Sequence, residues 1–403
     1  MAYKGIDYLR NKLERKKTRV DLRYKYYEMK QLVRDFNIST PPELKYWFET
    51  LGWCAKAVDS IADRLVFRTF ENDLYNMAGI FRANNQDVLV DSAILGALIS
   101  SCDFIYISAG EDGFPRLRVI DGGHATGIID PLTNMLQEGY AVLETDDNNV
   151  PIIEAHFITG QMVIYERKRI AYSVPNEAPY PLLVPMINRP DAVRPFGHSR
   201  ISRACMGIMN SAIRTIKRSE ISAEFYSYPQ KYVLGMSEDA EQMDTWKASM
   251  SSFLRIDKDD DGDHPVVGQF QTGPMTPHSE QLRMLAGVFA GETGLTLDDL
   301  GFPSQNPSSS EAIKSSHESL RLTARKAQRT FGTGLLNTGY LAACVRDNYP
   351  YSRSQVADTV LKWEPIFEPD AATLSTIGDG VIKINQGIPG YFDAIKLRDI
   401  TGM

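Results

Sequence analysis

The residues best suited to metal chemistry lie in one acidic stretch, DKDDDGDH, at 257–264. Carboxylates at its first, third and fifth positions and glycine at its sixth match the first half of a calcium-binding loop. The second half departs from that pattern, because Pro265 stands at position nine and Gly268 replaces the glutamate of position twelve. We therefore interpret the stretch as a solvated loop tip and predict no metal site. A metal-dependent hydrolase that uses the 257–264 cluster is the alternative.

Groups that could act as nucleophile or base are present but poorly arranged. Ser316, His317 and Glu318 are adjacent in a segment predicted to be helical, where neighbouring side chains point in different directions and cannot form a relay. His124 follows two glycines and His156 lies between strand-like residues, so turn and sheet packing account for both. The P-loop, GxGxxG, HExxH and GxSxG motifs are absent from the sequence. The sequence thus predicts no catalytic residue, no cofactor and no enzyme activity.

A row of arginines is the clearest candidate for contact with an anion. Arg321, Arg325 and Arg329 are spaced four residues apart, which places them on one face of a helix, and Lys314 and Lys326 lie nearby. Such a row serves as a solvated face, as a set of salt bridges between subunits, or as a contact with a polyanion. All three interpretations remain open at this stage.

Composition and charge restrict the class of protein. A content of 43% hydrophobic and 24% charged residues is typical of globular proteins, and no apolar run is long enough for a signal peptide or a membrane span. A membrane partner is therefore not expected. The formal net charge of −7 argues against a purely electrostatic DNA-binding protein. Four cysteines lie far apart in apolar contexts and are expected to be reduced core residues: Cys54, Cys102, Cys205 and Cys344.

The charge is unevenly distributed along the chain. Residues 1–34 hold eleven Lys/Arg and four Asp/Glu. We call this segment the basic arm; the rest of the chain carries a large net negative charge. The arm interleaves Tyr24, Tyr26 and Tyr27 with its cations, which suits nucleic acid or an acidic protein surface. A surface helix of an assembly is the alternative.

Hydrophobic periodicity predicts an α+β protein, mainly helical, with one β-rich unit. A capping box at Thr40–Glu43 predicts a long helix over 41–66, and three glycines, Gly332, Gly334 and Gly339, favour a kink in a late helix. The β-rich unit is expected at 104–187. The remaining helices are expected at about 84–102, 197–226, 277–293 and from 308 to 337 or beyond, with strands at QKYVLG and DTVLKWEPIF, a short helix at EDAEQMDTWKASMSS, and two short helices at the end.

The loop between the last two long helices is unusual in composition. From Gly301 to Ser310 it has no charge but carries glycine, two prolines and several serines. A loop of this kind makes weak, reversible polar contacts, because it lacks the lysines and arginines that would hold phosphate.

The order of these parts resembles that of the portal proteins of tailed bacteriophages, the head-to-tail connectors of siphovirus-type particles. The stretches that carry the resemblance span nearly the whole chain: RYKYYEMK, WCAKAVDSIADRLVFRTF, FGHSRISRACMGIMNSAIRTIKRSEISAEFYSYPQKYVLG, GETGLTLDDLGFPSQNPSSSEAIKSSHESL and GDGVIKINQGIPGYF. The resemblance implies a homo-oligomeric ring, usually of about twelve copies, at one capsid vertex of the virion. Another ring-forming head–tail or tail component is the alternative.

The resemblance also implies partners and a place of synthesis. Double-stranded DNA would pass through the axial channel during packaging and ejection, and the protein would be made in the host cytoplasm. The large terminase subunit and then a head–tail adaptor would dock on the ring, and major capsid and scaffold proteins would surround it. No cofactor is implied.

The parts of the portal fold can be placed on this sequence by position. The resemblance implies a wing at 1–190, stem helices at 191–228 and 276–296, a small α/β clip at 229–275, a tunnel loop at 297–310, a long wing helix with a return strand at 311–367, and a short helical crown at 368–403. The tunnel-loop residues would be Asp298, Leu300, Gly301, Phe302, Pro303, Ser304, Gln305, Asn306, Pro307 and Ser308. The clip residues expected to dock partners are Asp257, Asp259, Asp260, Asp261 and Asp263.

Overall fold

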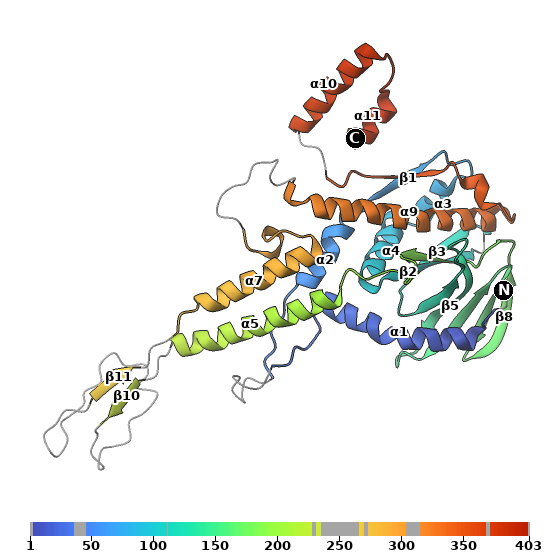
Figure 1. Ribbon diagram of the computed structural model, residues 1–403. Helices are drawn as coiled ribbons and strands as arrows, with labels where there is room; N and C mark the ends of the chain where they lie inside the picture. The colour runs from blue at the N-terminus through green and yellow to red at the C-terminus, as the bar shows by residue number, and fades with distance from the viewer. Residues whose placement is uncertain are drawn as a thin grey trace. The chain divides into compact units, whose positions relative to one another are not determined.

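The chain forms two compact units, each built from separate stretches of sequence (Figure 1). The computed structural model describes residues 3–35, 46–110, 112–227, 231–234, 266–269, 273–303, 315–367 and 371–401. The first unit comprises Met1–Gln31, Gly52–Met206 and Thr293–Met403, and the second comprises Leu32–Leu51 and Gly207–Glu292. Helices and strands both occur in each described unit, which confirms the predicted α+β class.

Antiparallel strands make up the centre of the first unit. A three-stranded sheet has the order β3-β2-β9, and a five-stranded meander has the order β4-β5-β6-β7-β8. Both sheets lie within the segment predicted to be β-rich. The strands are β2 (Cys102–Ala109), β3 (Pro115–Ile120), β4 (Ala125–Ile129), β5 (Leu136–Thr145), β6 (Pro151–Ile158), β7 (Gln161–Glu166), β8 (Arg169–Pro175) and β9 (Leu183–Ile187).

Two helices, α4 (Gln86–Ser100) and α9 (Glu318–Asp347), pack on the three-stranded sheet. The second half of α9 is buried almost all round, and its glycines bring the helix close to its neighbours. A Cβ at Gly334 would lie 2.5 Å from the sulfur of Met186, and one at Gly339 would lie 2.8 Å from the sulfur of Met77. Glycines that suggested a kink therefore lie within one continuous helix, where they permit close packing.

The basic arm forms a helix, α1 (Ile6–Tyr27), that is part of the first unit. Leu9 and Leu13 are buried against Tyr140 and Val142 of β5. This apolar contact fixes one face of α1 on the five-stranded sheet, and it places the cations of the arm on the remaining faces.

Two buried carboxylates fasten the start of α1 to the same sheet. Glu138, which is fully buried, accepts hydrogen bonds of 2.8 Å from the backbone N–H groups of Lys4 and Gly5. Its Oε1 also lies 2.8 Å from Nε2 of His156, which confirms the predicted packing role of that histidine. A carboxylate before the first turn is favoured by the unpaired N–H groups and by the helix dipole.

Glu154 on β6 holds Arg10 by a two-point contact. Arg10 Nε and Nη2 donate to the two carboxylate oxygens at 2.9 and 2.7 Å, and Tyr140 donates to the same carboxylate. Glu154 is 1% exposed, so the pair is shielded from water and fixes the rotation of α1 about its axis.

The long helix predicted at 41–66 is shorter in the structure. Residues 46–52 are described and are not helical, and α2 spans Trp53–Ala62 with Gly52 as its N-cap. The capping box at Thr40–Glu43 lies outside the described residues. The prediction was wrong at 46–52, because residues 46–51 belong to the second unit. There the ammonium of Lys217 lies 5.7 Å from the Phe48 ring centroid.

The second unit contains two long helices and a pair of short strands. They are α5 (Arg203–Ser227), whose first turn belongs to the first unit, α7 (Thr276–Thr293), and the antiparallel strands β10 (Lys231–Leu234) and β11 (Val266–Gln269). Ser222 on α5 and His278 on α7 lie side by side, with 3.2 Å between Oγ and Nε2. Both predicted helices and the QKYVLG strand are confirmed, whereas the short helix predicted at 238–252 lies outside the described residues.

The first unit is completed by elements from both ends of its sequence. Strand β1 (Phe67–Glu71) pairs antiparallel with β12 (Val360–Trp363), beside the short helix α3 (Met77–Ala83). Two 3-10 turns, η2 (Asp298–Leu300) and η3 (Arg353–Val356), lie on either side of α9 in sequence. The final helices, α10 (Ala371–Gly387) and α11 (Ala394–Thr401), confirm the predicted helical end. Among the described helices, none has the length and apolar character needed to span a bilayer.

Candidate functional site: a groove beside α9 and the loop base before it

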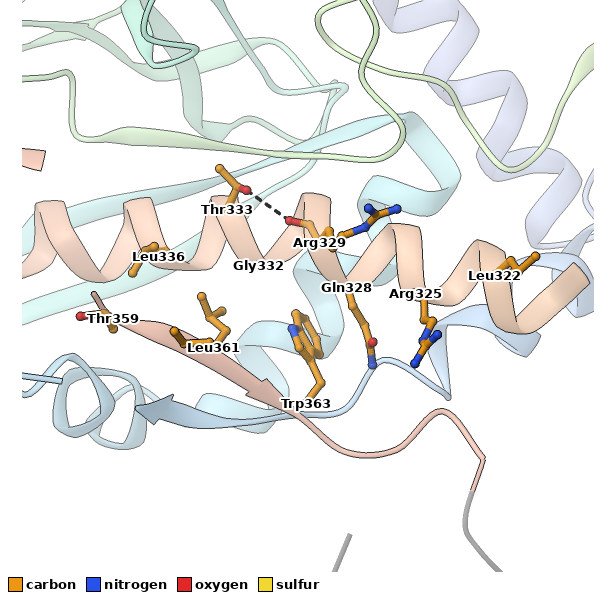
Figure 2. Close-up of a pocket in the computed structure, with 11 residues that line it drawn as sticks. Leu322, Arg325, Gln328, Arg329, Gly332, Thr333, Leu336, Thr359, Leu361 and Trp363 are labelled. Carbon is orange, nitrogen blue, oxygen red and sulfur yellow. Dashed lines mark hydrogen bonds between the residues drawn. The ribbon is translucent and has the colours of Figure 1, made fainter. Parts of the chain in front are cut away.

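A groove of about 720 Å³ runs along the first half of α9 (Figure 2). One wall is the exposed face of α9, and the other is β12 with the residues that flank it. We call it the α9 groove. It is lined by Leu322, Arg325, Gln328, Arg329, Gly332, Thr333, Leu336, Thr359, Val360, Leu361 and Trp363.

The helix pattern explains why these side chains face the groove. Leu320, Ala324, Ala327 and Phe331 are buried at helical spacing, so the opposite face of α9 is left to line the groove. The other wall is held by strand pairing, because Trp363 pairs with Phe67 of β1 and their ring centroids are 5.8 Å apart. Both walls of the groove are therefore held in place, one by the buried face of α9 and the other by the pairing of β12 with β1.

The structure treats the three predicted arginines differently. Arg321 makes a two-point contact with Glu318, from Nε at 2.7 Å and from Nη2 at 2.6 Å. The hydrogen bond from Arg321 lowers the pKa of Glu318. Arg325 and Arg329 are exposed along the α9 groove, and neither forms an ion pair within the part of the chain that the structure describes. Lys314 lies outside the described residues.

The base of the predicted tunnel loop is closely bonded. Gly294 ends α7 with a φ of +70°, and the side chains of Thr296 and Asp299 then bond one another across the first turn of η2. Asp299 Oδ2 accepts from the backbone N–H of Thr296 at 2.9 Å, and the Thr296 hydroxyl accepts from the N–H of Asp299 at 3.2 Å. Leu300 is buried below this turn, and Gly301 follows with a φ of +89°.

The return of the loop lies against the same base. A Cβ added at Gly294 would lie 2.8 Å from the hydroxyl of Ser319, in the first turn of α9. His317 Nδ1 lies 3.8 Å from Asp299 Oδ2, and its ring centroid is 6.2 Å from that of Phe367. Both ends of the 304–314 segment are thus fixed at one place. His317 lies beside Asp299 and Phe367, whereas Glu318 is bonded to Arg321, so the two neighbouring side chains have different partners.

The structure places some of the predicted site residues and leaves others outside its described part. Asp298 and Pro303 are exposed, Phe302 is partly buried, and Leu300 is a packing residue of the loop base. The remaining predicted loop residues lie outside the described residues: Ser304, Gln305, Asn306, Pro307 and Ser308. The predicted clip residues do so as well: Asp257, Asp259, Asp260, Asp261 and Asp263.

Two features of the structure were missed from the sequence. The pairing of β12 with β1 makes Trp363 and Leu361 a wall of the α9 groove, and no local pattern reveals a partner strand so far away in sequence. A second row of cations lies on one face of α1, and its spacing at 12, 16, 19 and 23 was a usable helical signal.

Over almost its whole length the chain is similar to phage proteins that carry the name portal protein, although no protein-family model matches the sequence. The portal protein of Mycobacterium phage L5 is 21% identical over 391 residues, which cover 90% of this chain and 78% of that protein. The portal protein of Mycobacterium phage D29 is 21% identical over 402 residues, which cover 94% of this chain and 81% of that protein. These relatives confirm the resemblance to phage portal proteins.

Solved structures of gene transfer agent (GTA) particles also contain chains similar to this one. A chain from the neck of the native particle, computed with C12 symmetry, aligns with a TM-score of 0.48 and 14% identity, and covers 93% of this chain and 95% of that chain. A chain from the neck of the empty particle, computed with C6 symmetry, aligns with a TM-score of 0.44 and 11% identity, over 90% of this chain and 93% of that chain.

Proposed function

We propose that this chain is the subunit of a phage portal ring, which sits at one capsid vertex and surrounds the channel for double-stranded DNA. The observation that carries the proposal is the alignment of nine-tenths of the chain with two proteins named portal protein. The role is structural: the ring admits DNA during packaging, releases it during ejection, and catalyses no reaction.

In this proposal the 297–310 loop is the tunnel loop, the part of each subunit that faces the DNA in the channel. Its base is suited to the task, because the Thr296–Asp299 bonds and buried Leu300 hold it while Gly301 begins an uncharged stretch. An uncharged loop touches a moving polyanion without forming the ion pairs that release counterions and add affinity. Asp298, exposed at the base, adds repulsion between the loop and phosphate.

The α9 groove is assigned to contact between neighbouring subunits rather than to DNA. Leu322 is 55% exposed and Val360 is 51% exposed, beside the wall that contains Trp363. Burial of such apolar side chains against protein lowers the free energy, whereas contact with phosphate does not bury them. Arg325 and Arg329 then meet acidic side chains of the neighbour, in the head-to-tail contact that closes a ring.

The other partners follow from position in the chain. The clip at 229–275, with its acidic residues 257–263, would dock the large terminase subunit during packaging and a head–tail adaptor afterwards. The wing would face the major capsid and scaffold proteins, and the basic arm would lie on its outer side, away from the channel. Reversal of charge at Asp259 and Asp261 is expected to lower the yield of packaged genomes, and an unchanged yield would contradict this docking.

Electron microscopy of the purified full chain tests the ring. Negatively stained protein should show rings with a central hole and about twelvefold symmetry. The double variant Leu322→Asp with Val360→Asp should stay monomeric, because two charges would enter the buried contact. Ile170→Asp is the matched control, since Ile170 is 68% exposed on β8, and it should form rings as the unchanged chain does.

Two alternatives have distinct outcomes. A tail component would leave filled heads when the gene is removed, whereas loss of a portal leaves no packaged genome. A hydrolase that uses the 257–264 cluster would bind a divalent metal in calorimetry and lose activity in Asp259→Ala. A chain that remains monomeric at every concentration would refute the ring.

A further inference from the structure

A cavity of about 450 Å³ lies in the first unit between α1, the start of β2 and the 193–197 loop. We call it the α1 cavity. Five cationic side chains line it, four from α1 and one from the loop. They are Lys12, Lys16, Arg19, Arg23 and Arg194.

The four cations of α1 lie on one face of the helix. Spacings of four, three and four residues keep successive side chains within a narrow angle, and the row is about 16 Å long. The helix cannot turn to move the row into water, because Leu9 and Leu13 are buried on the sheet and Glu154 holds Arg10. The fold therefore keeps these charges in the cavity.

The cations of the α1 cavity are not neutralised by protein carboxylates. In the parts of the chain that are described, none of the five forms an ion pair, although their neighbours offer weaker partners. Lys12 Nζ donates to the carbonyl of Gly127 at 2.5 Å, and Arg23 donates to the carbonyl of Ser100. The ammonium groups of Lys12 and Lys16 also lie 4.8 and 4.9 Å from the centroid of the Phe196 ring.

The acidic groups behind the row do not supply the missing charge. Burial raises the pKa of Asp103 to about 8, so this carboxyl is mostly protonated at neutral pH. Burial also raises the pKa of the Cys102 thiol, which stays neutral. Asp121 is ionised despite its burial, because a 2.6 Å contact with His124 and the N–H of Gly123 lower its pKa. The negative charge of Asp121 therefore pairs with His124 and not with the cations of the α1 cavity.

Without a bound anion, the row of cations in the α1 cavity destabilises the folded protein. Burial and repulsion from Lys16 and Lys4 lower the pKa of Lys12 to about 8, and burial with repulsion from Arg19 and Arg194 lowers that of Arg23 to about 10. Repulsion among like charges in a partly desolvated space raises the free energy of the folded state. A bound anion would remove that penalty.

We propose that the α1 cavity binds a phosphate group, held by Lys12, Lys16 and Arg23 with Arg19 and Arg194 at its mouth. Guanidinium and ammonium donors that converge from a helix and a facing loop suit a tetrahedral phosphate group, whose oxygens accept hydrogen bonds from more directions than a planar carboxylate does. The phosphate is a phosphodiester of nucleic acid or a free polyphosphate. The inference does not depend on the ring or on the portal role.

Calorimetry of the purified full chain at low salt tests the site with two probes, sodium tripolyphosphate and a short DNA duplex. We expect one tripolyphosphate bound per chain, and a loss of affinity of at least about tenfold in the double variant Lys12→Gln with Arg23→Gln. Lys25→Gln is the matched control, because Lys25 is exposed on α1 and does not line the cavity. If the duplex binds with the same dependence on these residues, nucleic acid is the source; if only tripolyphosphate does, free phosphate is.

Thermal unfolding separates loss of binding from loss of fold. Without phosphate the double variant should melt at the temperature of the unchanged chain or above, because removing repelling charges relieves the folded state. With tripolyphosphate only the unchanged chain and Lys25→Gln should be stabilised. Failure of both probes to bind, equal binding by the double variant, or tighter binding of a poly-glutamate peptide than of either probe would overturn the proposal.

Discussion

Helices α1 and α9 each carry a row of cations at spacings of three or four residues, but the two rows lie in different surroundings. The row on α9 borders an open groove, and its first member, Arg321, is paired with Glu318. The row on α1 lines a cavity and has no ion pair among the described residues. The same spacing thus produces a hydrated face on one helix and a partly desolvated cluster on the other.

The difference shows that the burial of charges, rather than their spacing, sets their effect on stability. Exposed pairs contribute little because water and salt screen them, whereas partly buried cations repel one another and raise the free energy of folding. Four experiments test this contrast, starting with the contact that fixes the α1 row in place.

At a single pH, removal of the carboxylate that holds α1 should give the largest change in the free energy of unfolding. In Glu154→Gln the guanidinium of Arg10 loses its buried carboxylate partner and keeps only the exposed Asp7, 2.9 Å from Nη1, and we expect a loss of about 3 kcal/mol in the free energy of unfolding. Urea titration measures it. Glu166→Gln, on the exposed end of β7, is the control and should unfold like the unchanged chain. Equal stability of the two variants would show that the α1 row is not held by this contact.

The pH dependence of Asp103 tests whether the region behind the α1 row is neutral. The folded pKa of this carboxyl is raised to about 8, so the stability it contributes is complete below its usual pKa near 4 and is lost as the pH rises through 8. Between pH 4 and 8 the free energy of unfolding should fall by at most about 1.4 kcal/mol per pH unit.

Asp103→Asn should remove that fall, because asparagine does not titrate and retains an oxygen to accept from Ser100 and Gly122. Asp147→Asn, in an exposed turn, serves as the control for the same denaturant series. If Asp103→Asn keeps the full dependence on pH, Asp103 is ionised and neutralises the row, and the contrast with α9 disappears.

Removal of one cation from the α1 row should stabilise the protein. Lys12 has its pKa lowered from 10.5 to about 8, mainly by burial, so its charge opposes folding below pH 8. Lys12→Gln should gain about 1 kcal/mol at pH 7, less than the full linkage value because the ammonium is partly exposed. In the unchanged chain, stability should rise between pH 8 and 10.5, since the unfolded state retains a proton that the folded state releases. A destabilised Lys12→Gln protein would contradict this account.

The arginines of the α9 groove should give the smallest effect on the fold. In Arg325→Gln with Arg329→Gln, urea titration of the monomer is expected to match the unchanged chain, since both side chains are exposed and unpaired among the described residues. Ring formation, measured by size-exclusion chromatography, should be weakened because the groove is proposed to contact a neighbour. Intact rings together with an unchanged unfolding curve would remove the arginines from the interface.

Local patterns predicted much of the fold, and long-range contacts account for what they missed. The apolar stripes of α5, α7 and α9 and the alternation from Phe104 onward were visible because each repeats within a few residues. The helix predicted from residue 41 was too long because Trp47 and Leu51 continue its stripe by chance, while the chain crosses into another unit at Gly52. No local sequence pattern shows where the chain passes from one compact unit to the other.

The candidate site was predictable in part for the same reason. The spacing of Arg321, Arg325 and Arg329 and the bland composition after Gly301 are local features and could be read from the sequence. The ion pair between Arg321 and Glu318 could also have been predicted from the sequence, because the two residues are three positions apart on a helix. The opposite wall of the groove, Leu361 and Trp363, depends on the pairing of β12 with β1, and the α1 cavity depends on a loop at 193–197.

The pairing of β1 with β12 has a consequence for the order in which the chain acquires its structure. Phe67 pairs with Trp363, so this ladder cannot form on a ribosome until at least residue 363 has emerged. Residues 207–292, by contrast, are contiguous and can form their helices early. Closing so large a span carries a high entropic barrier, and such contacts form slowly. The α9 groove is therefore completed only after β12 has paired with β1, and the subunit contact that we propose for it would form after this ladder.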